Sequence, residues 1–180
     1  MSSNPPKKQW FAMRDLSRRN ANIMAHHTLS ESGVKVFTPM KEMIMTIRGR
    51  KQIRNVPVIQ DLLFVHEEKN ILDSHVRKIP RLQYRYSKGK TVNEPLVIPD
   101  DCMQMFIFAV SNTENPKYFM PGDLTEAMLG KKVHIIGGAL DGFEGYLLSV
   151  RGMRKRRLIV SIPNFVAAAV EVQPEFIKLE

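Results

Sequence analysis

The chain has 180 residues, of which 43% are hydrophobic, a proportion typical of a globular protein with a packed core. Its 27 Lys and Arg residues against 18 Asp and Glu give a net charge of +9, which favours anionic partners such as nucleic acid. Cys102 is the single cysteine, which excludes an internal disulfide and a cysteine-based zinc site and fits a reducing compartment. The first eight residues lack the apolar segment of a signal peptide, and no apolar run approaches the roughly 18 residues that span a membrane. We therefore expect a soluble cytoplasmic protein that has no contact with membranes.

Strand and helix patterns alternate over the first 111 residues. The predicted elements are a strand over 9–16, a helix over 18–32, a strand over 34–37, hairpin strands over 43–47 and 51–59, a strand over 61–66, a helix over 70–78, a strand over 82–86 and a helix from about Pro99 through Val110. Ser17 and Gly33 are the expected cap and stop of the first helix, and Arg48-Gly49-Arg50 is the expected hairpin tip.

The region after this alternation contains only strand signals. Residues 112–123 carry Asn, Thr, Pro and Gly with little periodicity, which predicts a linker. The patch at 166–172 places three helix-favouring alanines between strand-favouring valines, and we assign it as a strand. The predicted organisation is therefore a disordered tail over 1–8, a domain over 9–111, a linker over 112–123 and a domain over 124–180.

The positive charge is distributed unevenly along the sequence. Residues 1–123 hold 19 basic and 12 acidic side chains, whereas residues 124–180 hold 8 and 6. If the protein contacts nucleic acid, the N-terminal part is the better candidate.

Glycines punctuate the link between two strand-like runs near the C-terminus. Gly138, Gly142 and Gly145 lie between Val133–Ile136 and Tyr146–Val150, a rhythm that predicts a tight, bulged turn. This segment resembles the KOW motif of NusG-type transcription factors and of several ribosomal proteins.

Four N-terminal segments resemble the N-terminal domain of NusG, in the order and spacing of that family. They are Trp10-Phe11-Ala12, Val34-Lys35-Val36-Phe37-Thr38-Pro39, Leu63-Phe64-Val65 and Val76-Arg77-Lys78-Ile79-Pro80-Arg81-Leu82. The resemblance implies an α/β N-terminal domain with a mainly antiparallel sheet flanked by helices, followed by a small all-β SH3-like barrel. Ile59-Gln60-Asp61-Leu62 departs from the family's aromatic- and glycine-containing turn, and the texture is similar to specialised UpxY-type antiterminators of Bacteroidota, which act on capsular polysaccharide operons.

The resemblance implies that the N-terminal domain docks on the clamp of RNA polymerase and suppresses pausing and termination without a chemical step. The matching apolar positions are Phe11, Ile59, Leu62, Phe64 and Tyr84. Leu62 is the strongest candidate because it takes the place of the family's exposed aromatic residue. The alternative is that residues such as Phe11 and Phe64 belong to the core of the sheet.

Several cations are candidates for positions near upstream DNA or nascent RNA. They are Arg14, Arg18, Arg19, Arg48, Arg50, Lys51 and Arg77, with a solvated charged face as the alternative reading. A further run places five cations in the seven residues 151–157, where RNA contact and simple solvation are again the alternatives. The resemblance implies that the C-terminal domain of a monomeric factor recruits either Rho or a small-subunit ribosomal protein.

The sequence offers little support for an enzyme. His26 and His27 are adjacent, no His-Glu-x-x-His spacing occurs, and Gly137-Gly138 lacks the Lys-Ser/Thr of a phosphate loop. We therefore expect no catalytic residue, metal or cofactor. The main rival to a transcription factor is a KOW-containing RNA-binding protein of the ribosome or translation apparatus, with a nuclease as a distant third. A C-terminal domain that refolds as helices is a further alternative, which the alanines favour and the glycines oppose.

Overall fold

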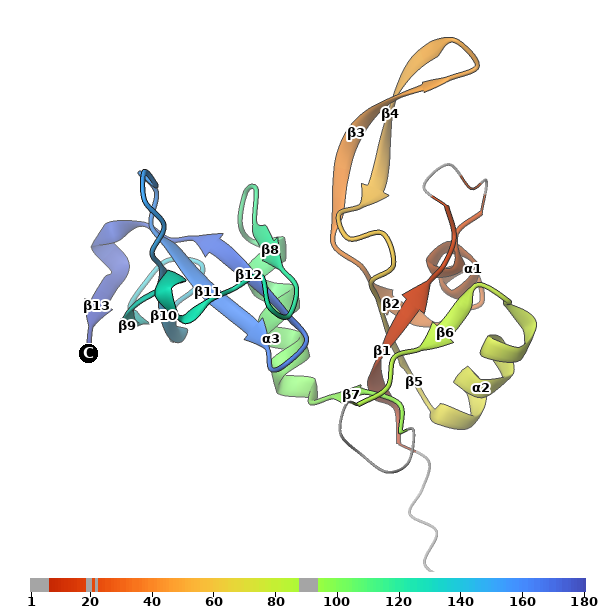
Figure 1. Cartoon of the computed structure of the whole chain (residues 1–180). Helices are drawn as coiled ribbons and strands as arrows, with labels where there is room; N and C mark the ends of the chain where they lie inside the picture. The colour runs from red at the N-terminus through yellow and green to blue at the C-terminus, as the bar shows by residue number, and fades with distance from the viewer. Residues whose placement is uncertain (1–6, 19–20, 22, 88–93) are drawn as a thin grey trace, which may run out of the picture. The chain divides into compact units, whose positions relative to one another are not determined.

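The computed structural model describes residues 7–18, 21, 23–87 and 94–180. The chain divides into two compact units, Met1–Asp100 and Asp101–Glu180, called here the N-terminal unit and the C-terminal unit (Figure 1). Among the described residues, no helix is both long enough and apolar enough to cross a membrane.

An antiparallel sheet forms the centre of the N-terminal unit. Its strands are β1 (Gln9–Asp15), β2 (Lys35–Phe37), β5 (Leu63–Glu67), β6 (Leu82–Tyr84) and β7 (Val97–Ile98). The order is β2-β5-β1-β6, and β7 pairs with the part of β1 that β6 leaves free. The predicted strands are confirmed as β1, β2, β5 and β6, with ends that shift by one or two residues, whereas β7 was not predicted.

Two helices pack against one face of this sheet. α1 spans Ala25–Glu31 and α2 spans Lys69–Lys78. Leu29 of α1 and Leu72 of α2 are fully buried against Phe11, Met13 and other inward residues of β1, β5 and β6. Alternate residues of the strands therefore supply the core on this face, as the period of a strand requires.

The first helix is shorter than the sequence predicts, and its expected cap is wrong. α1 begins at Ala25 rather than near Arg18, and Met24 at its N-cap makes no side-chain hydrogen bond. Ser17 does not cap the helix, because it lies eight residues before Ala25; its backbone N–H donates to Asp15 Oδ1 at 2.9 Å. The helix stop is confirmed, since Gly33 has φ +78° and its N–H donates to the carbonyl of Ser30.

A two-stranded hairpin extends from the N-terminal unit (Figure 1). It consists of β3 (Met40–Ile47) and β4 (Arg50–Pro57), which pair antiparallel from Met40 and Pro57 at the base to Ile47 and Arg50 at the tip. The predicted hairpin and its tip are confirmed, and β3 begins at Met40, directly after Pro39 and three residues earlier than expected.

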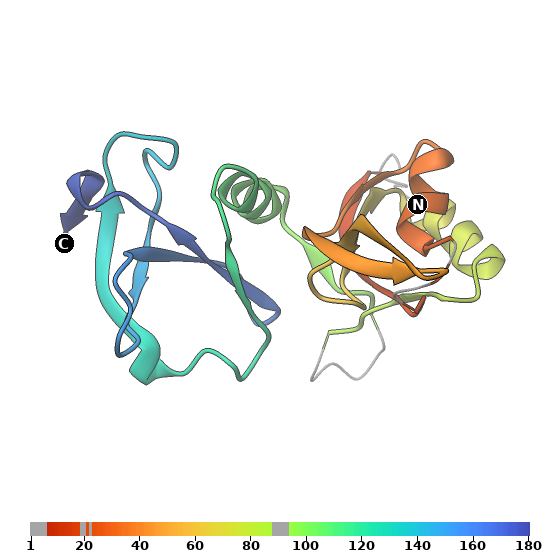
Figure 2. The same cartoon turned by 90° about the horizontal axis from the view of Figure 1, so that it is seen from above.

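The C-terminal unit combines one helix with a six-stranded antiparallel sheet, which can be followed in Figure 2. Its elements are α3 (Asp100–Ser111), β8 (Lys117–Phe119), a 3₁₀ turn (Glu126–Met128), β9 (Leu129–Ile135), β10 (Glu144–Leu148), β11 (Arg157–Ile162), β12 (Val166–Glu171), a second 3₁₀ turn (Pro174–Phe176) and β13 (Ile177–Leu179). The strand order is β13-β9-β10-β11-β12-β8. The predicted fold class, an α/β region followed by an all-β region, is confirmed.

The alanine patch forms β12, which lies next to the edge strand β8 in this sheet. Ala168 and Ala169 are fully buried, and β12 pairs with β11 on one side and with β8 on the other. Tertiary pairing therefore overrides the helix preference of alanine, and the predicted strand is confirmed.

The division into units differs from the expected domain limits. α3 lies with the C-terminal unit from Asp101 onward, and residues 112–123 include β8. At three residues β8 is too short to produce a readable periodicity, so its sequence looks like a linker.

Candidate functional site

Four of the five residues expected to contact the polymerase clamp are buried. Phe11 and Tyr84 lie on the helix-covered face of the sheet with ring centroids 5.8 Å apart. Phe64 is also buried, with its ring centroid 6.3 Å from that of Phe37. Leu62 is buried as well, with 1% of its surface exposed. Only Ile59 keeps part of its surface.

The burial of these four residues leaves little of their surface for a partner. The expectation that Leu62 is exposed is wrong, because Leu62 is enclosed and its carbonyl accepts a hydrogen bond from Thr38 Oγ1 at 2.8 Å. Side chains without surface area stabilise the unit but cannot supply much contact area to a partner. Direct contact of these residues with polymerase stays a prediction, and exposed neighbours are better candidates.

An ion-pair cluster occupies the turn where the sequence departs from the family pattern. Asp61 Oδ2 lies 3.1 Å from Arg14 Nη2 and 3.1 Å from Arg85 Nη2, and Arg85 also donates to the backbone carbonyl of Asp61. Burial lowers the pKa of Arg85, and the carboxylate of Asp61 opposes that effect. Sequence reasoning missed this cluster because its members are far apart along the chain.

The cluster joins the ends of β1 and β6 to the turn at Asp61 through charged side chains. Exposed apolar side chains are present at the ends of the same or neighbouring strands, at Leu16, Tyr86 and Val97. A mixed surface of this kind suits a protein interface with a polar rim.

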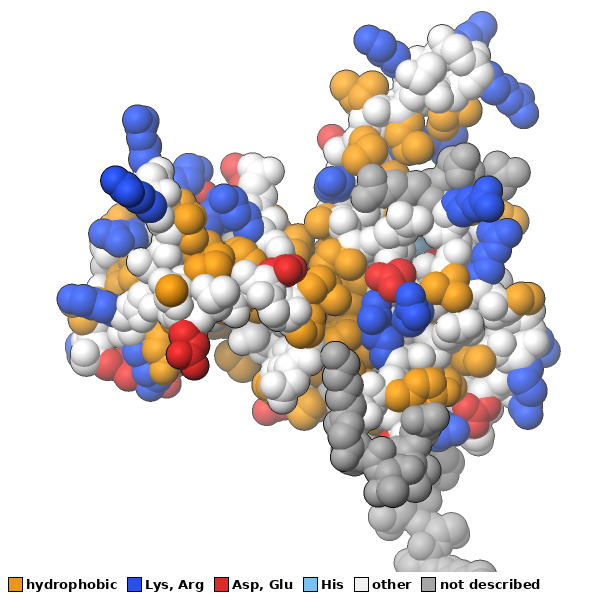
Figure 3. Space-filling view, in the orientation of Figure 1, with side chains coloured by type: hydrophobic (Ala, Val, Ile, Leu, Met, Phe, Trp, Pro, Cys, Tyr) orange, Lys and Arg blue, Asp and Glu red, His pale blue; other side chains and the backbone are white. Residues whose placement is uncertain are grey.

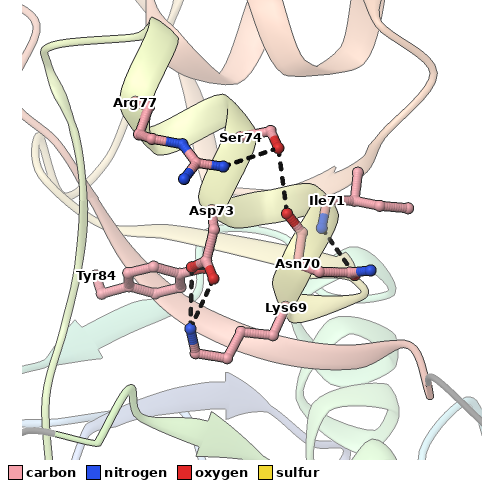
Figure 4. Close-up of polar contacts among 7 residues, drawn as sticks. All are labelled: Lys69, Asn70, Ile71, Asp73, Ser74, Arg77 and Tyr84. Atoms are coloured by element: carbon pink, nitrogen blue, oxygen red, sulfur yellow. Dashed lines mark hydrogen bonds and ion pairs between the residues drawn. The ribbon is translucent and has the colours of Figure 1, made fainter.

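Tyr84 has a structural role that Figure 4 displays. Its hydroxyl donates to Asp73 Oδ1 at 2.8 Å, and Lys69 Nζ lies 2.8 Å from the other oxygen of the same carboxylate (Figure 4). Burial, followed by the hydrogen bond to Asp73, raises the pKa of Tyr84, whereas the hydrogen bond from Lys69 lowers the pKa of Asp73. This network ties α2 to β6, which explains why Tyr84 is oriented inward.

The remaining expected cations of the N-terminal unit do not form one patch with the cluster. Arg18 is exposed after β1, and Arg19 lies outside the described residues. Arg77 is exposed on α2, where it donates to Ser74 Oγ at 3.4 Å (Figure 4). No contact of these side chains points to a ligand.

The tip of the β3–β4 hairpin gathers the other expected cations. Arg48, Arg50 and Lys51 are exposed, and within the described part of the chain none of them reaches a carboxylate. Figure 3 shows Lys and Arg side chains in blue at the outer end of the hairpin. Arg48 has φ +50° and Gly49 φ +76°, values of a two-residue turn in which Asn-Gly is normally preferred. The turn therefore holds an arginine in a backbone conformation that is unfavourable for a residue with a Cβ atom.

The strands of the hairpin expose apolar side chains below this charged tip. Ile44 and Ile53 are directly paired, and each is 68% exposed. Met40 at the base is exposed as well, and β3 and β4 pair with no other described strand. Two strands alone are marginally stable in water, and exposed apolar patches mark interaction sites, so this surface is suited to a partner.

The three glycines of the expected KOW motif form the β9–β10 turn and its exit. Gly138 and Gly142 have φ +72° and +81°, in the region that glycine tolerates best. Gly145 instead lies in β10, where an added Cβ atom would be 2.9 Å from the carbonyl oxygen of Ile159. The sequence signal thus identifies positions that need glycine for two different reasons.

A family comparison assigns the chain. The protein family described as "Transcription termination factor nusG" matches residues 8–107, which is more than half of the sequence. The chain belongs to the NusG family. Members of this family are transcription factors that bind RNA polymerase, and the matched region contains the sheet, α1, α2 and the hairpin.

Among solved structures, a NusG from Thermotoga maritima, described as "Domain interaction in Thermotoga maritima NusG", is similar to this NusG-family chain. It shares 18% identity over 96% of this chain and 97% of its own, with a TM-score of 0.47. A search of curated protein sequences found no match.

Proposed function

We propose that this NusG-family protein is an elongation and antitermination factor that docks on RNA polymerase through its β3–β4 hairpin and the adjacent strand ends. The observation that carries the proposal is the paired, exposed Ile44 and Ile53 beneath an uncompensated cationic tip. The apolar pair suits a protein surface, and the tip suits phosphates of upstream DNA.

The mechanism requires no chemical step. A factor that binds the elongating state of polymerase more tightly than the paused state shifts the equilibrium toward elongation by its difference in affinity. The same preference disfavours termination, which proceeds from paused complexes.

We infer that the factor is operon-specific and of the capsular polysaccharide type. The support is the overall texture of the sequence, which resembles UpxY-type proteins, and the turn at Ile59-Gln60-Asp61-Leu62, which departs from the usual family pattern and supplies Asp61 to the ion pairs with Arg14 and Arg85. A specialised relative can differ from a general factor in how it contacts polymerase, and an altered turn next to the docking surface is a place for such a difference. The C-terminal unit would recruit Rho or a small-subunit ribosomal protein.

The first test is a pull-down of purified core RNA polymerase with the full chain. Ile44→Asp combined with Ile53→Asp should reduce polymerase retention about tenfold or more, because it places two charges in the apolar contact. The matched control is Ile136→Asp with Tyr146→Asp, which changes two exposed apolar residues of the C-terminal unit. Circular dichroism checks that both variants stay folded.

The second test is single-round transcription over a pause site and a terminator, on a template from a capsular operon and on an unrelated template. Wild-type protein should increase readthrough, most on the capsular template, and the Ile44/Ile53 variant should not. Equal retention of both variants would contradict docking through the hairpin. Tight binding of wild type to RNA without any retention of polymerase would favour the ribosomal alternative.

A further inference from the structure

The loop between β10 and β11, residues 149–156, is a second concentration of positive charge. It contains Arg151, Arg154, Lys155 and Arg156 and no acidic residue. Residues 101–180 hold nine basic and nine acidic side chains in total, so this loop concentrates cations in a unit that is neutral overall. Figure 3 shows blue side chains extending from this end of the C-terminal unit.

The loop is held to the unit by its backbone and by one apolar side chain. Met153 packs against the core cluster that includes Leu148 and Ile159, and its N–H donates to the carbonyl of Val150 at 3.2 Å. Gly152 at the turn has φ +82°, and the carbonyl of Arg156 accepts a hydrogen bond from the N–H of Val172. An anchored loop presents its side chains with less ordering cost on binding than a free one.

Two of the five cations in the run at 151–157 are already engaged within the protein. Arg157 is buried and donates to the carbonyls of Asn115 at 2.9 Å and Ala169 at 3.1 Å. Lys155 forms an ion pair with Glu171 at 2.8 Å. These two side chains stabilise the loop's attachment to β11 and β12.

The other three cations of the run are exposed. Arg151, Arg154 and Arg156 reach no carboxylate in the described part of the chain. Guanidinium groups present planar pairs of donors that match phosphate oxygens. A tight protein contact would need a central apolar anchor, whereas Met153 faces the core and Val150 alone is exposed here. The three exposed guanidinium groups therefore favour the phosphate backbone of a nucleic acid as the ligand of this loop.

We propose that the 149–156 loop is a nucleic-acid-binding site of the C-terminal unit, where Arg151, Arg154 and Arg156 bind backbone phosphates independently of the β3–β4 hairpin. Such a site makes the protein bivalent for nucleic acid, with one basic surface on each unit. Bivalent attachment increases retention on a strand through effective concentration. The inference does not depend on polymerase docking.

The test uses the full chain with its hairpin tip neutralised by Arg48→Gln, Arg50→Gln and Lys51→Gln, so that the first basic surface is removed. In this background, Arg151→Gln, Arg154→Gln and Arg156→Gln are compared with a matched control. The control removes the same charge from three exposed residues elsewhere on the unit: Lys117→Gln, Lys131→Gln and Lys178→Gln. Anisotropy measures binding to labelled single-stranded RNA, single-stranded DNA and duplex DNA of one sequence between about 50 and 200 mM salt.

The loop variant should bind about tenfold more weakly than the control. Its slope of log affinity against log salt should be smaller by about 2, since each phosphate contact to a single strand contributes about 0.7. Tighter binding of RNA would identify the nascent transcript as the ligand of the loop. Tighter binding of DNA would identify the template region as its ligand. Equal binding by the loop variant and the control would overturn the proposal. Equally tight, loop-dependent binding of polyglutamate would overturn it in favour of an acidic protein partner.

Discussion

Asp15 connects the end of β1, the segment after it and the start of α1. Its Oδ1 accepts from the N–H of Ser17, and its Oδ2 accepts from the N–H of His26 at 3.3 Å, in the first turn of the helix. A carboxylate at that place satisfies a free helix donor and interacts favourably with the helix dipole. Burial alone would raise the pKa of Asp15, but the hydrogen bonds from His26 and Ser17 hold its pKa at about 2.

Asp15→Asn should lower the free energy of unfolding at pH 7 by about 2 kcal/mol, because a depressed pKa is a measure of the stabilisation of the charged form. The folded pKa lies below the unfolded one, so the wild-type advantage is complete above the ordinary pKa of 3.8 and is lost as the pH falls to about 2. Trp10, the single tryptophan, is buried in β1 and reports unfolding of this unit by fluorescence.

Glu42→Gln is the matched control for Asp15→Asn, because Glu42 is an exposed hairpin carboxylate. It should leave the unfolding midpoint unchanged. A deficit of the Asn variant that persists undiminished at pH 2 would show that the charge of Asp15 is not the cause.

At this scale the sequence predicts residue types better than residue roles. Phe11, Phe64 and Tyr84 are correctly recognised as parts of a sheet, but the sequence cannot show that Leu62 is enclosed or that Asp15 caps a helix ten residues away. Both properties depend on how separate segments pack. Local pattern contains no information on such contacts.

The elements of the C-terminal sheet depend on close backbone approach. Gly145 pairs with Val133 of β9, while its Cα lies against β11, where a Cβ would be 2.9 Å from the Ile159 carbonyl oxygen. The neighbour is backbone rather than a flexible side chain, so β10 and β11 would have to separate.

Gly145→Ala should therefore destabilise the sheet by about 1–3 kcal/mol, the usual cost of overpacking. Hydrogen exchange of the β10 and β11 amides in the full chain should be correspondingly faster. Gly142→Asn is the control: Gly142 has φ +81° with no atom within 4 Å of an added Cβ, and asparagine tolerates this conformation. Unchanged exchange in Gly145→Ala would indicate that the strands adjust without cost.

Element type was predictable where a signal is local, as in the Arg48-Gly49-Arg50 tip and the Gly33 stop. It was less predictable at α1, where the helical apolar spacing begins near Arg18 but the helix begins only at Ala25. β8 illustrates the opposite difficulty, since its three residues become a strand only by pairing with β12.

At the scale of the whole molecule, charge separates the two units. Residues 1–100 hold 18 basic and 9 acidic side chains, whereas residues 101–180 are balanced. The uneven distribution was visible in the sequence, whereas the domain limit expected at residues 112–123 stays a prediction. Phe106 and Phe108 of α3 contact Tyr118 and Phe143, with ring centroids 6.5 Å and 6.0 Å apart.

These contacts predict that a fragment of residues 101–180 is more stable than a fragment of residues 124–180. The shorter fragment corresponds to the domain expected from the sequence. The longer fragment keeps β8 paired with β12 and both aromatic contacts of α3. Its melting temperature should be higher by at least about 5 °C, since losing roughly 1 kcal/mol shifts a domain of this size by 4–8 °C. Equal melting temperatures would place α3 and β8 outside the folded C-terminal domain.

The exposed hairpin has a practical consequence for proteolysis. Five residues of the hairpin are exposed and are followed by bonds that trypsin recognises: Lys41, Arg50, Lys51 and Arg54 on the two strands and Arg48 at the tip. A hairpin with two unpaired edges opens locally more often than the central sheet, so limited digestion should cut there first. A bound partner that covers the hairpin would slow this cleavage, and the rate of a single nick becomes a label-free reporter of whether the factor is engaged.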